Sequence, residues 1–429
     1  MKEGMKAYYG VTFLIGLGFF TMGLMDPLYD TYVPIFLSKY ISSKGLIGTV
    51  MTLDNLFALF LIPVVSAFSD KTTTRIGRRM PYIIVSLPLA AICFGLIPFS
   101  ALSSLGLLVV AVFLLNVFKQ AARGPVVALM PDIVPGKYRS EANGVINTMG
   151  GIAAIVGTIG LAKLMDVKIN LPGRGPTDEI LPFPVAGILV ILATVVLFAF
   201  IKEKHRAEGE EKVGALKSLK LIFAGRDRST FLILVALFLW FLGYQGVLPF
   251  IGLYSKEVIG VSTGTAGLAA GMVAIAYAIF AILSGVVAHR KGRKAVIRFS
   301  LLALSVITLV LAGHGMFSRL FGLSQTVMLL SFFVLLFVFG TFWVTVVTNS
   351  FPMLWQMATF GNMGIYTGLY YTFSQTAAII APPITGFIID IFGFGGIFLF
   401  ASVCMLSAFF VMGNVSKGEA LEPAAESAG

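Results

Sequence analysis

Long apolar runs separated by short polar loops dominate the pattern of this chain. Runs of about 20 apolar residues, long enough to cross a bilayer as a helix, recur along all 429 residues. They are continuously apolar and do not alternate, which predicts membrane helices and not barrel strands. We expect twelve spans, at residues 8–37, 45–69, 80–101, 104–131, 143–165, 183–201, 230–254, 263–288, 295–316, 324–350, 362–389 and 395–413.

One long polar segment divides these spans into two sets of six. The pattern predicts an all-α polytopic membrane protein, with twelve transmembrane helices in two pseudo-symmetric six-helix bundles. We expect residues 1–201 to form the N-terminal bundle and 202–229 a cytoplasmic linker. Residues 230–413 then form the C-terminal bundle, and 414–429 a cytoplasmic tail.

The two sets of spans also repeat each other in sequence. Tyr29 and the basic run that begins at Arg75 have counterparts at Tyr244 and at the run from Arg290, each 215 positions further on. Each half runs through apolar helix, basic turn and helix in the same order. Duplicated halves in so apolar a chain are typical of a membrane transporter whose substrate site lies where the halves meet.

Composition and charge narrow the class of protein further. The chain is 58% hydrophobic and 12% charged, with a mean hydropathy of +0.94, so most of its surface must face lipid. Of the 31 Lys and Arg residues, 22 fall in segments that are cytoplasmic if the N-terminus is inside, and seven fall outside. This bias predicts a plasma (cytoplasmic) membrane protein with both termini in the cytoplasm. It also explains the net charge of +11 without a nucleic-acid partner.

The sequence offers little for enzyme chemistry. The two cysteines, Cys93 and Cys404, lie inside apolar spans, and the three histidines are scattered, so we expect no metal site. Neither a phosphate-binding loop nor a nucleophile with its base is present in the pattern. We therefore expect no enzyme and no cofactor, and a chain that works as a monomer with a small-molecule substrate, a coupling ion and membrane lipid as its partners.

The loop from Asp70 to Arg79 carries the clearest motif. A tight cytoplasmic turn requires a glycine, here Gly77, and Asp70 at a helix end can pair with arginines in only one conformation. The loop would then act as a latch. The alternative is that its arginines are topology signals alone, and that Asp132 is a plain helix cap. The gating set we predict is Asp70, Arg75, Gly77, Arg78, Arg79, Asp132, Arg139, Arg290, Gly292 and Arg293.

This loop resembles the signature loop between helices 2 and 3 of the major facilitator superfamily. Within it, the segments 78–82, 123–125, 128–132 and 139–144 are similar to those of the glycoside-pentoside-hexuronide:cation symporters and the related sucrose transporters. The resemblance covers most of the first half and, in the second, mainly residues 290–294. It implies uptake of a sugar or glycoside by alternating access, driven by a proton or sodium gradient.

Two features depart from the family pattern. Melibiose-type members carry an acidic pair in helix 2 for the cation, whereas this helix offers Asp54, about one turn displaced. Sucrose-type members carry an arginine just after the Gly-Pro of helix 4, whereas Arg123 precedes Gly124 and Pro125. The first departure bears on sodium coupling, and the second on the sugar-binding role of the arginine.

Charged residues inside the spans are the best mechanistic signal. Asp26 and Asp30 are four apart on helix 1, and Lys119 and Arg123 are four apart on helix 4, so each pair projects from one helix face. With Asp54, three acids stand against two bases. A charge inside a bilayer costs at least ~2.5–3.5 kcal/mol on insertion scales, so such residues usually face a wet cavity and a partner.

We assign ion coupling to Asp26, Asp30 and Asp54, and choose Asp30 as the proton carrier. Its repeat counterpart is the neutral Gln245, so the charge belongs to one half only. The alternative is that all these charges form structural salt bridges that hold the helices together.

A sugar site combines an aromatic platform with hydroxyl, amide and carboxylate groups, because a pyranose has an apolar face and a rim of hydroxyls. Trp240 also fits this chemistry, although Trp240 and Trp343, taken singly, suit packing or an interfacial position better than ligand binding. The substrate-binding set that we predict is Tyr29, Asp30, Asn116, Gln120, Arg123, Tyr244, Gln245, Trp343, Asn349 and Gln375.

The sequence therefore predicts a secondary active transporter that moves a sugar or glycoside by alternating access, in symport with a proton. Two alternatives stay open. One is an exporter of apolar or cationic small molecules on the same fold, which the 38 Phe residues permit. The other is a membrane receptor or regulatory protein that has kept the fold without transport.

Overall fold

The structure, a computed structural model, describes residues 8–134, 139–203, 228–357 and 363–418. Among these residues, twelve helices are long and apolar enough to cross a membrane, which confirms the predicted all-α architecture. The chain forms two compact units. Unit 1 holds residues 1–209 and 249–274, and unit 2 holds residues 210–248 and 275–429.

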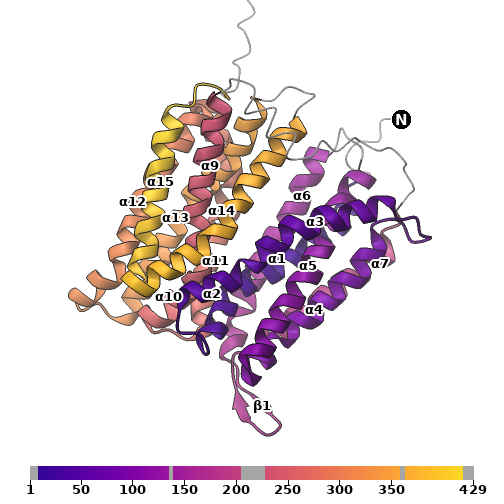
Figure 1. The fold of residues 1–429 in the computed structure, drawn as a ribbon, viewed down its shortest axis with the longest axis horizontal. Coiled ribbons are helices and arrows are strands. Elements are labelled where there is room, and N and C mark those ends of the chain that lie inside the picture. The colour runs from indigo at the N-terminus through magenta and orange to yellow at the C-terminus, as the bar shows by residue number, and fades with distance from the viewer. Residues whose placement is uncertain (1–7, 135–138, 204–227, 358–362, 419–429) are drawn as a thin grey trace, which may run out of the picture. The chain divides into compact units, whose positions relative to one another are not determined.

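Unit 1 contains the first six spans, coloured indigo to magenta in Figure 1. Consecutive spans run antiparallel, and the loops that connect them are short except for the loop after the fifth span. Their elements are α1 (Tyr9–Ser38), α2 (Lys44–Met51), α3 (Leu53–Lys71), α4 (Met80–Ser103), α5 (Leu105–Ile133), α6 (Arg139–Ile155), η3 (Val156–Gly160), η4 (Ala162–Asp166), β1 (Ile169–Leu171), β2 (Gly175–Thr177) and α7 (Pro182–Phe200).

Unit 2 contains most of the remaining six spans, while a segment at one end of its first two spans groups with unit 1. The elements of this half are α9 (Arg228–Val247), η5 (Leu248–Phe250), α10 (Ile251–Tyr254), η6 (Ser255–Ile259), α11 (Thr263–Lys291), α12 (Arg293–Leu320), α13 (Gln325–Trp355), α14 (Met363–Phe392) and α15 (Gly395–Gly413). Of these, residues 249–274 cover η5, α10, η6 and the first part of α11.

Three local features differ from uninterrupted helices. The second span breaks at Thr52 into α2 and α3, and the fifth ends in the π-helical turn η3 and the 3₁₀ turn η4. A short antiparallel hairpin, β1–β2, projects beyond the helix ends of unit 1 (Figure 1). The apolar pattern does not reveal it, because a three-residue strand outside the spans carries too few residues for a periodic signal.

Helices of unit 1 pack through small residues as well as through an apolar core. A methyl group added at Gly23 of α1 would clash with the backbone of Gly150 of α6, so these two helices touch along their main chains. Such close approach is how small residues bring membrane helices together, where lipid offers no hydrophobic gain. Beside this contact, Ile15, Leu87 and Val126 belong to one fully buried cluster that joins α1, α4 and α5.

Helices of unit 2 are joined by hydroxyl groups in buried positions. Ser305 of α12 and Ser402 of α15 exchange hydrogen bonds of 2.8 to 3.0 Å. Thr385 of α14 donates to the carbonyl oxygen of Gly246 in α9, at 2.8 Å. Hydrogen bonds of this kind stabilise helix pairs in a bilayer, where water does not compete for the same groups.

The predicted repeat is visible in the backbone of two turns. Gly77, before α4, has a φ of +106°, and Gly292, before α12, has a φ of +87°. Both values lie in a region that side chains other than glycine rarely adopt. The two basic loops, 215 positions apart, therefore turn in a similar way, each by means of a glycine.

Candidate functional site

The intramembrane charges of unit 1 form one cluster around Lys119. The Nζ atom of Lys119 lies 2.8 Å from Oδ1 of Asp26 and 2.9 Å from Oδ1 of Asp54. The lysine side chain is 1% exposed, whereas those of Asp26 and Asp54 are 29% and 16% exposed. One buried ammonium group thus bridges carboxylates from two other helices, and it also lies 5.0 Å from the ring centre of Tyr29.

Helix geometry explains how these side chains meet. Residues 26, 29 and 30 share one face of α1, and residues 116, 119, 120 and 123 share one face of α5, because their spacings are three and four. Asp54 lies in the first turn of α3, two residues after Thr52, where the helical hydrogen bonds continue from Thr52 to Gly48 and from Leu56 to Thr52.

Asp30 and Arg123 are the less engaged members of the cluster. Arg123 lies 3.9 Å from Asp26, and its side chain is 37% exposed. Asp30 is half-buried and makes no hydrogen bond or ion pair with any residue that the structure describes. The charges that act on it are those of Asp26, Asp54, Lys119 and Arg123. Since Lys119 already serves two carboxylates, Asp30 is the acid left over in this part of the chain.

Two buried amides extend the cluster along α5. The amide nitrogen of Asn116 donates to the hydroxyl oxygen of Tyr29 at 3.0 Å, and that of Gln120 donates to Oδ1 of Asp54. The amide oxygens of Asn116 and Gln120 have no hydrogen-bond partner among the described residues, although both side chains are fully buried. A buried acceptor without a donor is costly, so a donor from outside the chain would stabilise these two oxygens.

Unit 2 carries an aromatic stack on α9 and α13. The rings of Tyr244 and Trp343 are nearly parallel, 6° apart, with centres separated by 4.0 Å. Phe339 is parallel to both, and Phe241 meets Trp343 edge-on at 5.5 Å. The predicted aromatic residues of this half are thus brought together, with Phe241 and Phe339 as members that the sequence did not single out.

The predicted polar residues of unit 2 are less alike in their surroundings. Gln375 has an amide oxygen without a partner among the described residues, while Gln245 is half-buried. Asn349 is 3% exposed and donates to the carbonyl oxygens of Thr345 and Ser284, which indicates a structural role. Trp240 is fully buried and belongs to the packing of α9, where its indole nitrogen finds no partner among the described residues.

The α3–α4 turn forms a network of ion pairs within unit 1. Arg79 is 4% exposed, pairs with Asp70, and lies with Nε 2.9 Å from Asp132. Arg78 donates two hydrogen bonds to Asp132, at 2.5 and 3.1 Å, and this bonding raises the pKa of the Arg78 guanidinium. Asp132, near the end of α5, thus binds both arginines. The latch across the two halves remains a prediction, since these pairs lie inside one unit.

Glu203 is a member of this network that the sequence did not single out. Its side chain is 2% exposed, and its carboxylate accepts the backbone N–H of Arg79 at 2.9 and 3.1 Å. It therefore caps the start of α4, where a negative charge is favoured. It also lies 3.8 Å from the Arg78 guanidinium. The only hint in the sequence is that it is the first acid after the sixth span, in a stretch rich in lysine.

The other predicted gating residues differ in what they contact. Arg75 and Arg290 are exposed, and neither makes an ion pair with a described residue. Gly292 provides the turn before α12, and Arg293 begins that helix. Arg139 begins α6, but its side chain lies outside the described residues.

A further ion cluster of unit 1 lies at the loop after the β-hairpin. Glu179 pairs with Lys39 and Lys256 and accepts a hydrogen bond from Thr263. Burial opposes the charge, yet these hydrogen bonds lower the pKa of Glu179 to about 2. The backbone of Glu179 is left-handed, with a φ of +64°. The cluster ties α1 and the hairpin loop to segment 249–274.

Comparisons with known proteins agree with this architecture. The fold defines a membrane transporter of twelve helices with duplicated halves. The profile of the Major Facilitator Superfamily matches residues 11–376 and, in a second alignment, 260–426. The chain belongs to the Major Facilitator Superfamily. No curated protein sequence matches it.

Solved structures show the same fold at low sequence identity. A bacterial homolog of the human lysosomal transporter Spinster, in an inward-facing and occupied conformation, has a TM-score of 0.73 and 14% identity, over 95% of this chain and 97% of that one. The nucleoside transporter NupG has a TM-score of 0.72 and 10% identity, over 94% of this chain and 100% of that one. A D-xylose-proton symporter has a TM-score of 0.66 and 14% identity, over 96% of this chain and 98% of that one.

Proposed function

We propose that this chain is a secondary active transporter that moves a sugar or related polyhydroxylated solute together with a proton, by alternating access. The observation that carries the proposal is the arrangement around Lys119. This ammonium group is shared by Asp26 and Asp54, and Asp30 is left without an ion pair among the described residues. A carboxyl group in that position is the natural site for a proton that binds and leaves during transport.

Other features support a polyhydroxylated solute. The unpartnered amide oxygens of Asn116 and Gln120 accept hydrogen bonds from hydroxyl groups. The stacked rings of Tyr244 and Trp343 offer the flat apolar surface on which a pyranose ring packs. The D-xylose-proton symporter and the nucleoside transporter, which share the fold, are named for solutes that carry several hydroxyl groups.

Proton coupling agrees better with the cluster than sodium coupling does. A sodium site needs several oxygen ligands around one point. One oxygen each of Asp26 and Asp54 is already engaged by Lys119.

The test uses purified full-length protein in vesicles with an imposed proton gradient. A panel of sugars is screened for substrate-dependent proton entry with a pH dye inside the vesicles. Asp30→Asn is expected to reduce accumulation to simple equilibration, while exchange of labelled sugar across the membrane continues. Asp178→Asn, the same change at an exposed loop carboxylate, is the matched control and is expected to accumulate sugar normally.

Three results would contradict the proposal in different ways. Unchanged proton-driven accumulation by Asp30→Asn would remove this residue from the coupling role. Tight binding of a bulky lipophilic cation, with no response to any sugar, would favour the exporter. Absence of any solute-dependent ion movement would favour a receptor or regulatory protein.

A further inference from the structure

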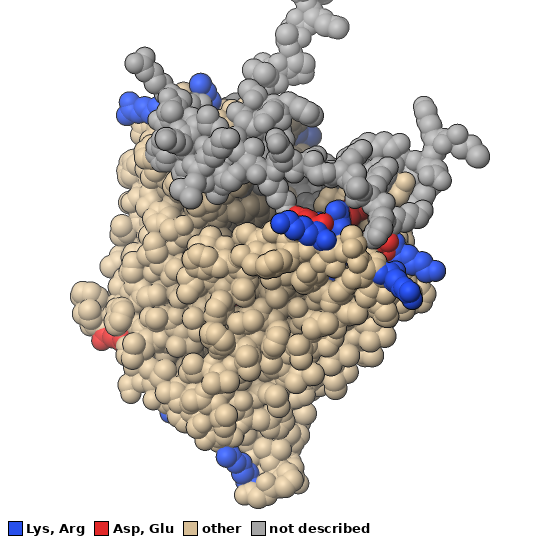
Figure 2. Space-filling model, turned by 45° about the vertical axis from the view of Figure 1, so that its right-hand side comes forward, with Lys and Arg blue, Asp and Glu red and all other residues tan. Residues whose placement is uncertain are grey.

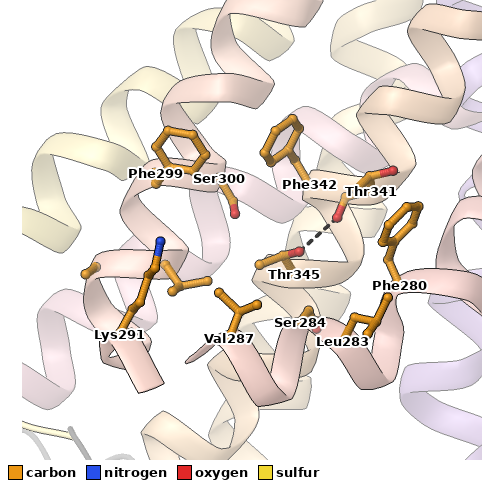
Figure 3. A pocket seen from close by; sticks show the side chains of 12 residues that line it. Phe280, Leu283, Ser284, Val287, Lys291, Phe299, Ser300, Thr341, Phe342 and Thr345 are labelled. Atoms are coloured by element: carbon orange, nitrogen blue, oxygen red, sulfur yellow. Dashed lines mark hydrogen bonds between the residues drawn. The ribbon is translucent and has the colours of Figure 1, made fainter. Parts of the chain in front are cut away.

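An apolar groove on unit 2 opens between α11, α12 and α13. It has a volume of about 460 Å³, within the roughly 300–1,000 Å³ typical of small-molecule sites. Its walls carry the rings of Phe280, Phe299 and Phe342, and the aliphatic side chains of Leu283 and Val287 (Figure 3). Phe299 is 65% exposed and Leu283 53% exposed, so the groove lies on the surface of a membrane protein.

Three of the four hydroxyl groups in the groove, those of Ser284, Thr341 and Thr345, are already satisfied by their own helices. Thr345 donates to the carbonyl oxygen of Thr341 at 2.9 Å, which Figure 3 marks, and Thr341 donates to Phe337 at 3.0 Å. Ser284 donates to Ala281 at 2.8 Å. With these three groups satisfied, the mostly apolar walls suit a hydrocarbon chain.

One charged group lies at an end of this groove. Lys291, in the last turn of α11, is exposed and makes no hydrogen bond or ion pair with a described residue. Figure 3 shows it at one end of the α11 side chains that line the groove, with Phe280 at the other. A hydrocarbon slot with an ammonium group at its end matches a lipid whose headgroup is anionic.

The wider charge of this end of unit 2 points the same way. The described part of unit 2 contains a single acid, Asp390, which lies just before α15 begins. Lys294, by contrast, donates to the carbonyl oxygen of Gly413, at the end of α15. A helix of 19 residues separates these two ends by roughly 28 Å. The α11–α12 turn is therefore a positive region without a described acid nearby.

We propose that this groove binds an anionic phospholipid, with an acyl chain between α11, α12 and α13 and the phosphate at Lys291. Basic pockets between membrane helices are suited to such headgroups. The positive-inside bias places the turn, and hence the lipid, in the cytoplasmic leaflet. The site is independent of the transported solute, since it lies within unit 2 and involves none of the residues proposed for coupling.

The test is lipid binding to the purified full chain, measured by native mass spectrometry in mild detergent. The protein is titrated with dioleoylphosphatidylglycerol or with the zwitterionic dioleoylphosphatidylcholine. The first is expected to occupy one site more tightly. Lys291→Gln is expected to weaken that binding about fivefold, the effect of one basic residue at a membrane surface. Arg319→Gln, which removes one exposed charge at the other end of α12, is expected to leave it unchanged.

A second pair of variants tests the apolar part of the site. Val287→Trp fills the groove and is expected to abolish the tight site, whereas Val286→Trp, at a neighbouring exposed position outside the groove, is expected to preserve it. Equal binding of the two lipids would overturn the proposal. Equal losses in Lys291→Gln and Arg319→Gln, or unchanged binding in Val287→Trp, would overturn it as well.

Discussion

The two basic turns occupy matching places in the repeat but differ in how their charges are held. In unit 1, Arg78 and Arg79 are bound by Asp70, Asp132 and Glu203, and Arg79 is nearly buried. In unit 2, no described acid lies near the α11–α12 turn. Of the cations there, Lys294 donates to a backbone carbonyl oxygen and Arg298 lies over the ring of Phe409.

This difference shows what the duplication retained. Both turns keep a left-handed glycine and a cluster of cations, because a short reversal between two membrane helices needs the first and membrane topology favours the second. Ion pairing is not required by either need. Acids of unit 1 bind the arginines of its turn within the same unit, whereas no described acid lies near the turn of unit 2.

The largest expected effect is on stability, and it comes from the same substitution made at matching positions of the two turns. Arg79→Gln removes the nearly buried guanidinium that pairs with Asp70 and Asp132, and we expect a loss of stability of about 3 kcal/mol, the lower end for a buried pair because Asp132 keeps Arg78. Its repeat counterpart, Lys294→Gln, removes a hydrogen bond to the carbonyl oxygen of Gly413 and should cost less, because it leaves no described acid without its partner. Unfolding of the purified variants by denaturant in detergent measures both. Equal costs would show that the ion pairs of unit 1 do not lock its turn.

A smaller effect is expected from the two glycines. An added Cβ at Gly77 would strike the side chain of Glu203 as well as strain the backbone, so Gly77→Ala should cost about 2–3 kcal/mol. Gly292→Ala meets the left-handed backbone strain, and should cost about 1–2 kcal/mol. The same unfolding measurement applies. A cost at Gly292 as large as that at Gly77 would argue against the capping role of Glu203.

The smallest effect concerns Glu179, at another ion cluster of unit 1. Its pKa in the folded protein is about 2, below the ordinary 4.5, so its ionised form stabilises the fold. This contribution is complete above pH 4.5 and is lost as the pH falls towards 2. Glu179→Gln should therefore cost about 1–2 kcal/mol at pH 7, since the partner lysines are partly exposed.

Thermal unfolding at a series of pH values checks this last prediction. The difference between wild type and Glu179→Gln should shrink between pH 4.5 and pH 2. Asp178→Asn, at the neighbouring exposed position, is the control and should unfold like the wild type throughout. A difference that persists unchanged at the lowest pH would mean that the cluster does not act through the charge of Glu179.

The twelve spans, the duplication and the membrane class were all predictable from sequence. The reason is that each rests on local properties: the length of an apolar run, the glycine of a turn, or the bias of lysine and arginine between loops. The sequence also shows that Asp26, Asp30 and Lys119 lie inside spans. Their spacing also predicted which of them share a helix face.

Tertiary structure decided which charges meet. Lys119 bonds to Asp26 across 93 positions of sequence, and Glu203 reaches the backbone of Arg79 across 124. No local pattern encodes such a pairing, because it depends on which helix faces pack together and where each helix starts. Apolar length alone thus fixes the spans, and the repeat singles out Asp30, while only the assembled helices of unit 1 decide which carboxylates pair with Lys119.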